Sequence, residues 1–493
     1  MKRLSYLTAL AAMALPLFLA GCEEQETPRL PAAAGQITVS TVDDTTVLLS
    51  VDAIEYALTY RWYKDGAEVQ NTPKRTYTAT GSGMYSVAGV NDDGEGARSP
   101  EVEVTIVREE PEPPVVEFNI LTEEYIPDPL FRQYVKDSIA GGADTFTNLQ
   151  AAEYNGAINL PGSDVASLVG VGYFTSVTDL NVNSSSLTEL DLNSNKELVR
   201  LDLTDCRSLS TLEIDSLEKL EILNLDFTGL QDLEFLTEFG SVGSLKEFIA
   251  YLPNCNQETL DLTRFENLEV VNVDRNRFYS IDVSNLSKLR ELSCSYQFPD
   301  DYWRENGLRT LSLSGCVSLS RLTCSFNILE ELDLSTNTGL MQLFCQENPG
   351  LGARLDISHL LGQLTELNVR NTGITSLDLS GSPQIERLQC ELNPLEQAPD
   401  LTDKPNLTFL RIEGCGLTGL LSIPDSPLLT ELYCYDNDLS YIDISGCTEG
   451  TLSNLQAFNN PNLKEIKVWP DFDMENPPRF NVGDAEYVYE FTE

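Results

Sequence analysis

The chain is poor in histidine and in positive charge. Its 493 residues include a single histidine, His359, and 32 Lys plus Arg stand against 77 Asp plus Glu, for a formal net charge of −45. With one histidine and no nucleophile motif beside it, a Ser-His-Asp or Cys-His catalytic site is not expected. The acidic balance repels polyanions, which argues against nucleic acid as a partner and against electrostatic binding to anionic lipid. We therefore expect a protein that is not an enzyme.

Closely spaced cysteines and a phosphate-binding glycine loop are also missing. Eleven cysteines are present, but after Cys22 they recur at long intervals, whereas zinc sites need spacings such as C-x₂-C. We therefore expect no metal centre, no cofactor, and cysteines that are buried free thiols. A disulfide between Cys324 and Cys345, which occupy equivalent positions in successive repeats, is the alternative.

The sequence lacks an apolar run of membrane-spanning length. Its longest apolar segment, Leu7 to Leu19, follows Lys2 and Arg3 and has the length of a secretory signal core. It is too short for a comfortable membrane span. The chain is therefore predicted to be exported, with residues 1–21 as the signal peptide.

The end of this signal carries a family resemblance. Leu19-Ala20-Gly21-Cys22 resembles the lipobox of bacterial lipoproteins, which implies that Cys22 is lipidated and becomes the first mature residue. A plain secretory signal with an incidental cysteine is the alternative. Glu23, Glu24 and Glu26 resemble the acidic signal that sends some lipoproteins to the outer surface of Gram-negative bacteria. The resemblance implies an outer-membrane protein exposed at the cell surface, attached to the membrane through lipid alone.

Most of the chain is a repeat. Leu319-x-x-Leu322-x-Cys324-x-x-Asn327 recurs 21 residues later from Leu340 to Asn348, and this spacing is the signature of leucine-rich repeats. Such a coil buries its apolar edge only by stacking on other coils. The first apolar residues of the predicted strands are spaced by 21 to 25 residues, with one spacing of 30: Val177, Leu198, Leu220, Leu245, Leu268, Leu289, Leu319, Leu340, Leu364, Ile385, Leu407, Leu429 and Leu452. A degenerate earlier turn is predicted at Ile158-Leu160-Val165.

Three positions of the repeat have a predicted chemical role. The ninth is often an asparagine that can bond backbone groups of the bend, and the sixth is often a cysteine facing the core. The second half of each coil repeats an aspartate, which we read as a solvated column with calcium binding as the alternative. In that order, the members are Asn276, Asn327, Asn348, Asn393, Asn437 and Asn460; Cys294, Cys324, Cys345, Cys390 and Cys434; Asp191, Asp261, Asp282, Asp333, Asp356, Asp378 and Asp443.

The segments that flank the array are predicted to be a tether, a β-sandwich, a linker and two caps. Residues 22–34 read as the lipidated tether, 35–107 as an all-β module and 108–117 as a proline-rich linker. Residues 118–176 form an N-terminal cap whose helix starts at Asp128-Pro129, 177–468 the repeats, and 469–493 a C-terminal cap.

The all-β module resembles bacterial immunoglobulin-like modules in its segments RWYKDG and SGMYSVAGVND. The resemblance implies that Trp62 is the core tryptophan and Tyr85 the corner tyrosine. The disulfide of the immunoglobulin family has no counterpart, since the module contains no cysteine. We interpret the module as a spacer, with a binding module as the alternative.

The whole sequence predicts a mainly β protein with irregular coils, a leucine-rich-repeat solenoid preceded by a small β-sandwich. It resembles bacterial leucine-rich-repeat surface lipoproteins and, more distantly, internalins. That resemblance implies non-enzymatic binding of a protein, in adhesion or capture. A glycan-binding lipoprotein of a nutrient-uptake system is the alternative.

The predicted binding site lies on the concave face of the solenoid. Side chains between the core leucines point outward there, and aromatic residues and arginines are enriched among them, as at binding hot spots. We expect these rings to form an apolar surface that is open to solvent, as at an interaction site, with mutual covering of the rings as the alternative. The 30-residue spacing also places the aromatic-rich segment 298–303 beside this face. The predicted ligand-binding residues are Phe326, Phe344, Arg370, Arg387, Arg411, Tyr433 and Tyr435.

The lipidation prediction is tested by replacing Cys22. A Cys22→Ala protein should lose its acyl chains and leave the membrane fraction, because no other segment of the sequence provides an anchor. Metabolic labelling with palmitate measures this directly. Labelling equal to that of the unaltered protein would contradict the assignment.

Overall fold

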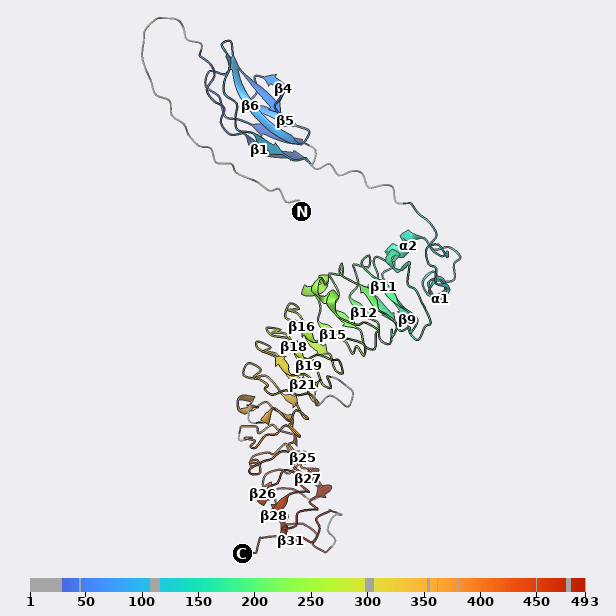
Figure 1. Ribbon diagram of the computed structural model, residues 1–493, viewed down its shortest axis with the longest axis vertical. Coiled ribbons are helices and arrows are strands. Elements are labelled where there is room, and N and C mark those ends of the chain that lie inside the picture. Colours follow the sequence, from blue (N-terminus) through green and yellow to red (C-terminus); the bar gives the residue numbers. More distant parts are fainter. Residues whose placement is uncertain are drawn as a thin grey trace, which may run out of the picture. The chain divides into compact units, whose positions relative to one another are not determined.

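The computed structural model describes residues 29–43, 46–106, 116–297, 306–352, 355–360, 362–379, 381–448, 450–475 and 480–492 (Figure 1). The chain divides into two compact units, and the boundary between them in the sequence follows Val116. The predicted signal peptide, the lipidation site Cys22 and the segment 298–303 lie outside the described residues. No helix in the described ranges is long and apolar enough to cross a membrane.

The first unit consists of two small antiparallel sheets. One has the strand order β1-β2-β5, and in the other β3 and β6 are central, with β4, β7 and β8 beside them. The strands are β1 (Thr38–Asp43), β2 (Thr46–Ser50), β3 (Thr59–Lys64), β4 (Ala67–Thr72), β5 (Thr76–Ala79), β6 (Gly83–Asn91), β7 (Gly94–Glu95) and β8 (Val102–Val104).

Trp62 and Tyr85 lie in the core of this unit. Both side chains are buried, and the Trp62 ring stacks on Tyr77 with centroids 5.8 Å apart. The Tyr85 hydroxyl donates a hydrogen bond to the carbonyl of Gly81 at 2.7 Å, four residues upstream. Aromatic packing and this one polar bond take the place of a cross-link. The two small sheets by themselves do not establish an immunoglobulin topology.

The second unit opens with the predicted cap. Its helices are α1 (Pro129–Tyr134), the π-helical turn η1 (Val135–Ile139) and α2 (Asn148–Glu153). The start of α1 is confirmed, because Asp128 Oδ1 accepts the N–H groups of Leu130 and Phe131 at 2.9 and 3.0 Å. Its other oxygen accepts the N–H groups of Ala166 and Ser167. Burial alone would raise the pKa of Asp128, but these four donors hold it below its ordinary value.

Within the described residues, a parallel sheet of 14 strands runs along the second unit, one strand from each coil. Each of the 13 predicted starts precedes a strand, and the predicted degenerate turn supplies the remaining one, β9. The strands are β9 (Ala157–Leu160), β10 (Asp179–Val182), β12 (Arg200–Asp202), β14 (Ile222–Asn224), β15 (Glu247–Ile249), β17 (Val270–Asn272), β19 (Glu291–Ser293), β21 (Arg321–Thr323), β22 (Gln342–Phe344), β23 (Glu366–Asn368), β24 (Arg387–Gln389), β25 (Phe409–Arg411), β27 (Glu431–Tyr433) and β29 (Asn454–Gln456).

The leucines of neighbouring strands stay in register throughout this sheet. Leu292 of β19 pairs with Leu322 of β21, and Leu322 pairs with Leu343 of β22. The first of these steps crosses the 30-residue coil and the second a 21-residue coil, yet the pairing is the same. The sheet therefore repeats coil by coil whatever the length of the outer bend.

The second half of the coils forms smaller sheets and 3₁₀ turns. Between the two halves lies one continuous core of leucine, isoleucine, valine, phenylalanine and cysteine. The elements are β11 (Glu189–Asp191) with β13 (Thr211–Glu213); β16 (Thr259–Asp261), β18 (Ser280–Asp282) and β20 (Thr310–Ser312); β26 (Thr418–Ser422), β28 (Asp438–Asp443), β30 (Glu465–Lys467) and β31 (Glu486–Val488); and η2 (Val171–Tyr173), η3 (Glu234–Thr237), η4 (Gly240–Gly243) and η6 (Ser358–Leu360).

The ninth-position asparagines form a ladder of buried amides. Asn348 donates one hydrogen bond to the carbonyl of Cys345 in its own coil and one to Cys324 in the preceding coil, at 2.9 and 3.0 Å. Its carbonyl oxygen accepts the N–H of Leu329 at 3.1 Å. The predicted role is confirmed, and the amides of the other five, Asn276, Asn327, Asn393, Asn437 and Asn460, bond in the same way.

One member of this ladder is a glutamine and so does not match the asparagine pattern of the sequence. Gln297 holds the ninth position of the coil that begins at Leu289, and its amide donates to the carbonyl of Val273 at 2.8 Å. Its own carbonyl oxygen accepts the N–H of Phe278. The longer side chain makes the same inter-coil tie from a bend of a different shape.

The ten cysteines of the described residues are all buried and free. Burial raises the pKa of their thiols, to about 12 for Cys345 and about 11 for Cys206. The interpretation as small core residues holds, and no bridge joins Cys324 to Cys345.

The aspartates of the second half-coils close their own bends. Asp333 Oδ1 accepts the N–H of Ser335, and Asp356 Oδ1 accepts both the N–H and the hydroxyl of Ser358. These bonds lower the pKa of both carboxyls. Within the described ranges, no three His, Cys, Asp or Glu side chains are grouped so as to hold a metal ion.

The amide ladder predicts a large effect of one deletion. Asn348→Ala should lower the free energy of unfolding by about 3 kcal/mol, because the buried carbonyl of Cys345 and the buried N–H of Leu329 lose their partner and the carbonyl of Cys324 keeps only the amide of Asn327. Urea unfolding at equilibrium measures the change. The matched control is Asn462→Ala, whose exposed amide donates only to Asp438, and which should change the stability by less than about 0.5 kcal/mol. Equal effects of the two changes would show that the ladder does not support the fold.

The cysteine environment predicts slow chemistry in the folded protein. Because the thiolate is the reactive form and burial disfavours it, alkylation under native, non-reducing conditions should modify few of the ten thiols. All ten should react after denaturation. Mass spectrometry of the intact protein counts the adducts, and several stoichiometric disulfides would contradict the structure.

Candidate binding face

The outward side chains of the 14-stranded sheet define what we call the sheet face. Its middle contains five residues that lie side by side in the strand register, which we call the central row: Phe344, Asn368, Gln389, Arg411 and Tyr433. Four steps of about 4.8 Å make this row roughly 19 Å long. It combines two aromatic rings at its ends with two amides and a guanidinium between them.

The seven predicted residues are not all placed on strands. Phe344, Arg387, Arg411 and Tyr433 lie on β22, β24, β25 and β27, as predicted. Phe326, Arg370 and Tyr435 instead follow the ends of β21, β23 and β27 by two or three residues, in the bend that leads to the ninth position. The structure therefore gathers six of them between β22 and β27 and sets Phe326 apart.

The prediction of an open apolar surface is wrong. All four predicted aromatic side chains are partly buried, because residues from neighbouring coils cover them. The guanidiniums of Arg321 and Arg411 lie over the rings of Phe344 and Tyr433, with centroid distances of 5.2 and 5.3 Å. Each cover comes from a neighbouring coil, about 22 residues away in the sequence.

The two remaining predicted rings are covered by other aromatic rings. Tyr296 stacks on Phe326 with centroids 4.1 Å apart, and Tyr435 stacks on Phe458 at 4.6 Å. The alternative that aromatic residues cover one another is thus realised at these positions. What remains exposed is a mixed surface of ring edges, amides and charged groups.

Hydrogen bonds between coils hold the polar side chains of the sheet face. The Tyr433 hydroxyl donates to Glu431 at 2.6 Å and accepts from the amide of Asn454 at 2.8 Å. Gln342 accepts from Arg321 and donates to Glu366. Side chains tied in this way lose little further conformational freedom on binding, which favours recognition by a rigid surface.

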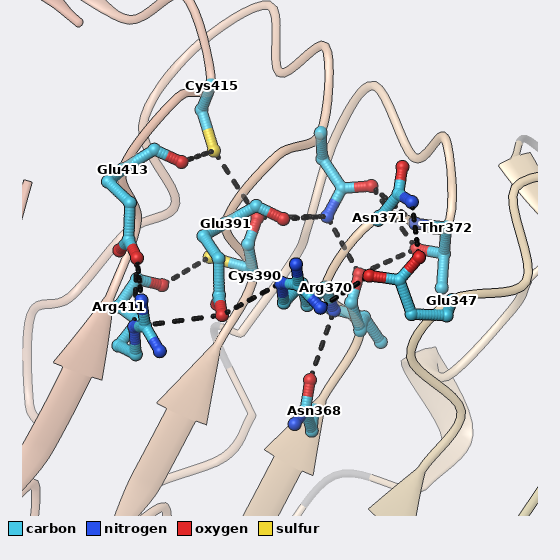
Figure 2. A network of polar contacts seen from close by, with 12 residues as sticks. Glu347, Asn368, Arg370, Asn371, Thr372, Cys390, Glu391, Arg411, Glu413 and Cys415 are labelled. Carbon is cyan, nitrogen blue, oxygen red and sulfur yellow. Dashed lines mark hydrogen bonds and ion pairs between the residues drawn. The ribbon is translucent and has the colours of Figure 1, made fainter. Parts of the chain in front are cut away.

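Two of the predicted arginines are already neutralised by carboxylates of the chain. Figure 2 shows Arg370 beside Glu347 of the preceding coil and Arg411 beside Glu413 of its own coil, each in an ion pair. The nitrogen Nε of Arg411 donates to Glu413 at 2.9 Å, and the Tyr435 hydroxyl approaches the same carboxylate oxygen at 3.3 Å. Sequence reasoning missed these glutamates, although Glu347 directly precedes a ninth-position asparagine.

A column of residues with positive φ sets the geometry behind this network. Glu347 and Leu392 have φ of 59° and 58°, a conformation that few residues other than glycine adopt. Their N–H groups donate to the carbonyls of Arg370 and Glu413 in the following coils, both at 2.9 Å. These bonds continue the strand pairing into the bend. They therefore fix where the side chains at the seventh position of the repeat lie, such as those of Arg370 and Glu413.

The single histidine is part of the opposite half of the coils. His359 Nε2 lies 2.7 Å from the carbonyl oxygen of Leu334, beside Asp333 and Asp356 in a shallow hollow. The two carboxylates accept hydrogen bonds within their own bends. His359 is therefore a surface side chain that is held by its hydrogen bond to the backbone.

Comparisons with known proteins support the repeat. Residues 126–248 match the family described as the leucine-rich-repeat domain of the endo-β-N-acetylglucosaminidase EndoS. A search of curated proteins finds none that matches this chain. The sequence match therefore covers the cap and the first coils, and it leaves the central row outside.

Solved structures are similar to this chain over a larger share of its length. The functional domain of InlJ from Listeria monocytogenes, described as including a cysteine ladder, is 23% identical over 71% of this chain and 76% of its own, with a TM-score of 0.52. An internalin of the same organism, InlF, is 16% identical over 75% and 97% of the two chains, at a TM-score of 0.45. A leucine-rich-repeat protein of Leptospira interrogans is 19% identical over 66% and 89%, at 0.44. The first of these supports the leucine-rich-repeat fold and nothing further.

Proposed function

We propose that this leucine-rich-repeat protein is a non-enzymatic binding protein that holds a protein partner on its sheet face. The observation that carries the proposal is the central row, in which two rings and a guanidinium are held by contacts between coils. Aromatic and arginine side chains of this kind dominate the energetics of protein interfaces. A rigid array loses little conformational entropy when it binds.

A glycan is the second candidate, and one observation favours it. The partly exposed amide of Gln389, beside the buried amide of Asn368, lies between the rings of Phe344 and Tyr433 in the strand register. Amides bond hydroxyl groups and rings cover apolar faces, so this sequence of groups suits a sugar chain about as long as the row. In that case the protein captures glycan for uptake.

The proposed location follows from the N-terminal segments. We propose that Cys22 is lipidated, that the protein is anchored in the bacterial outer membrane and exposed at the cell surface, and that the first unit is an immunoglobulin-like spacer. The buried Trp62 and the Tyr85 hydroxyl bond support the last point, since a tyrosine bonded to backbone a few residues upstream is typical of such sandwiches.

The central row is tested by removing the rings at its two ends. Phe344→Ala combined with Tyr433→Ala should weaken binding by about 2 kcal/mol or more, roughly thirtyfold in Kd, because both lie on the partner's proposed path. The immobilised protein is probed in parallel with purified cell-surface proteins and with a glycan array. Retention of a protein that the double variant fails to hold is the expected result.

The matched control is Phe227→Ala combined with Tyr251→Ala. These two rings contact each other near the sheet face, with centroids 4.6 Å apart, but they belong to earlier coils. The control should bind as the unaltered protein does. Loss of binding in the control alone would move the site away from the central row, and a response only on the glycan array would replace the proposed partner with the alternative one.

A further inference from the structure

Three carboxylates and two guanidiniums meet at the central row, to which Arg411 belongs, and their charges do not balance. Glu347, Glu391 and Glu413 come from three different coils, and Arg370 and Arg411 lie between them (Figure 2). Arg370 is bonded to Glu347 and Arg411 to Glu413, so each arginine is committed to one partner. Glu391 is the third carboxylate.

Glu391 is buried without a donor. Its side chain is 1% exposed, and among the described residues neither of its carboxylate oxygens accepts a hydrogen bond. The nearest cationic atoms are Nε of Arg370 and Nε of Arg411, at 3.6 and 3.7 Å from Oε1. These distances are too long for hydrogen bonds. A buried ionised carboxylate without hydrogen bonds is strongly disfavoured, and the ordinary remedy is to take up a proton.

The other charged and titratable groups around Glu391 do not offset the cost of burying its ionised carboxylate. Glu413, from the following coil, repels its charge, and the thiols of Cys390 and Cys415 beside it are neutral because burial raises their pKa. Tyr435 approaches Glu413, and Glu347 draws Arg370 toward the preceding coil. Burial is the main cause that raises the pKa of Glu391, to about 7. The backbone N–H of Glu391 itself, Arg411 and Arg370 oppose the rise, and Glu413 adds to it.

We propose that Glu391 is a proton-binding switch beneath the sheet face, which holds a proton in acidic to neutral solution and releases it as the medium becomes alkaline. Protonation leaves two carboxylates for two guanidiniums, so the cluster is neutral. Release of the proton leaves three carboxylates that compete for Arg370 and Arg411, whose side chains are 34% and 32% exposed at the sheet face. The charge that this surface presents therefore changes by one unit near neutral pH.

Release of the proton from Glu391 should lower the stability of the folded chain. The pKa of Glu391 is raised in the folded chain from 4.5 to about 7, so its stabilising contribution is complete below the unfolded value. This stabilising contribution declines as the pH rises from the pKa of the unfolded chain to that of the folded chain, and it is lost above the pKa of the folded chain. The opening equilibrium of the coils around Glu391 should shift roughly thirtyfold between about pH 5.5 and about pH 8.5.

Hydrogen exchange read by mass spectrometry tests this in the unliganded protein. After correction for the intrinsic exchange rates, peptides covering 387–413 of the unaltered protein should lose protection over that pH range. Glu391→Gln should remove the pH dependence and remain protected at alkaline pH, because an amide carries no charge. The matched control Glu386→Gln removes an exposed glutamate of the same coil and should keep the dependence.

A second variant covers the case in which Glu391→Gln does not fold. Glu413→Gln removes the charge that repels ionised Glu391, so the loss of protection should move to lower pH. Protection in the unaltered protein that is independent of pH would overturn the proposal. So would an unchanged dependence in Glu391→Gln, or an unmoved transition in Glu413→Gln. The measurement needs no binding partner, so its failure would leave the proposed function standing.

Discussion

A coil without helices or long strands must satisfy its backbone polar groups at every bend, and this requirement shapes the second unit. The buried amides of Asn348 and its equivalents meet it by bonding one carbonyl in their own coil and one in the preceding coil. Because a buried carbonyl without a donor is costly, each coil is complete only when its predecessor is present. The leucines fill the core between the sheets, but the amide ladder fixes the spacing and rotation at which they meet.

The separate roles of the leucines and the buried amides explain what could be predicted from the sequence. Positions that face the core or the bend have the same neighbours in every coil, so the period located each strand, the buried cysteines and the asparagines. Gln297 was missed because a longer side chain makes the same bond from an altered bend. The covering of Phe344 by Arg321 and the pairing of Arg370 with Glu347 were missed for a different reason. Both depend on which outward side chains happen to be adjacent in the stack, and the repeat pattern leaves those positions free.

The candidate site therefore differs in kind from the one that the sequence predicts. An open strip of rings flanked by free arginines would attract acidic partners by charge and apolar partners by area. The structure instead shows rings beneath guanidiniums and guanidiniums beside carboxylates. Discrimination on such a surface depends on hydrogen-bond geometry and on shape, because its charges are largely compensated. It also agrees with the strongly acidic balance of the whole chain, in which unpaired arginines would be exceptional.

The constant register of the leucines has a consequence for how such a chain changes over generations. Leu292 pairs with Leu322 across a 30-residue coil as Leu322 pairs with Leu343 across a 21-residue coil. A gene segment encoding one whole coil can therefore be gained or lost by recombination between similar repeats without disturbing the junctions on either side. Each such event lengthens or shortens the sheet face by one strand and places new outward side chains next to old ones. Diversification of the surface is then largely independent of the conditions for folding.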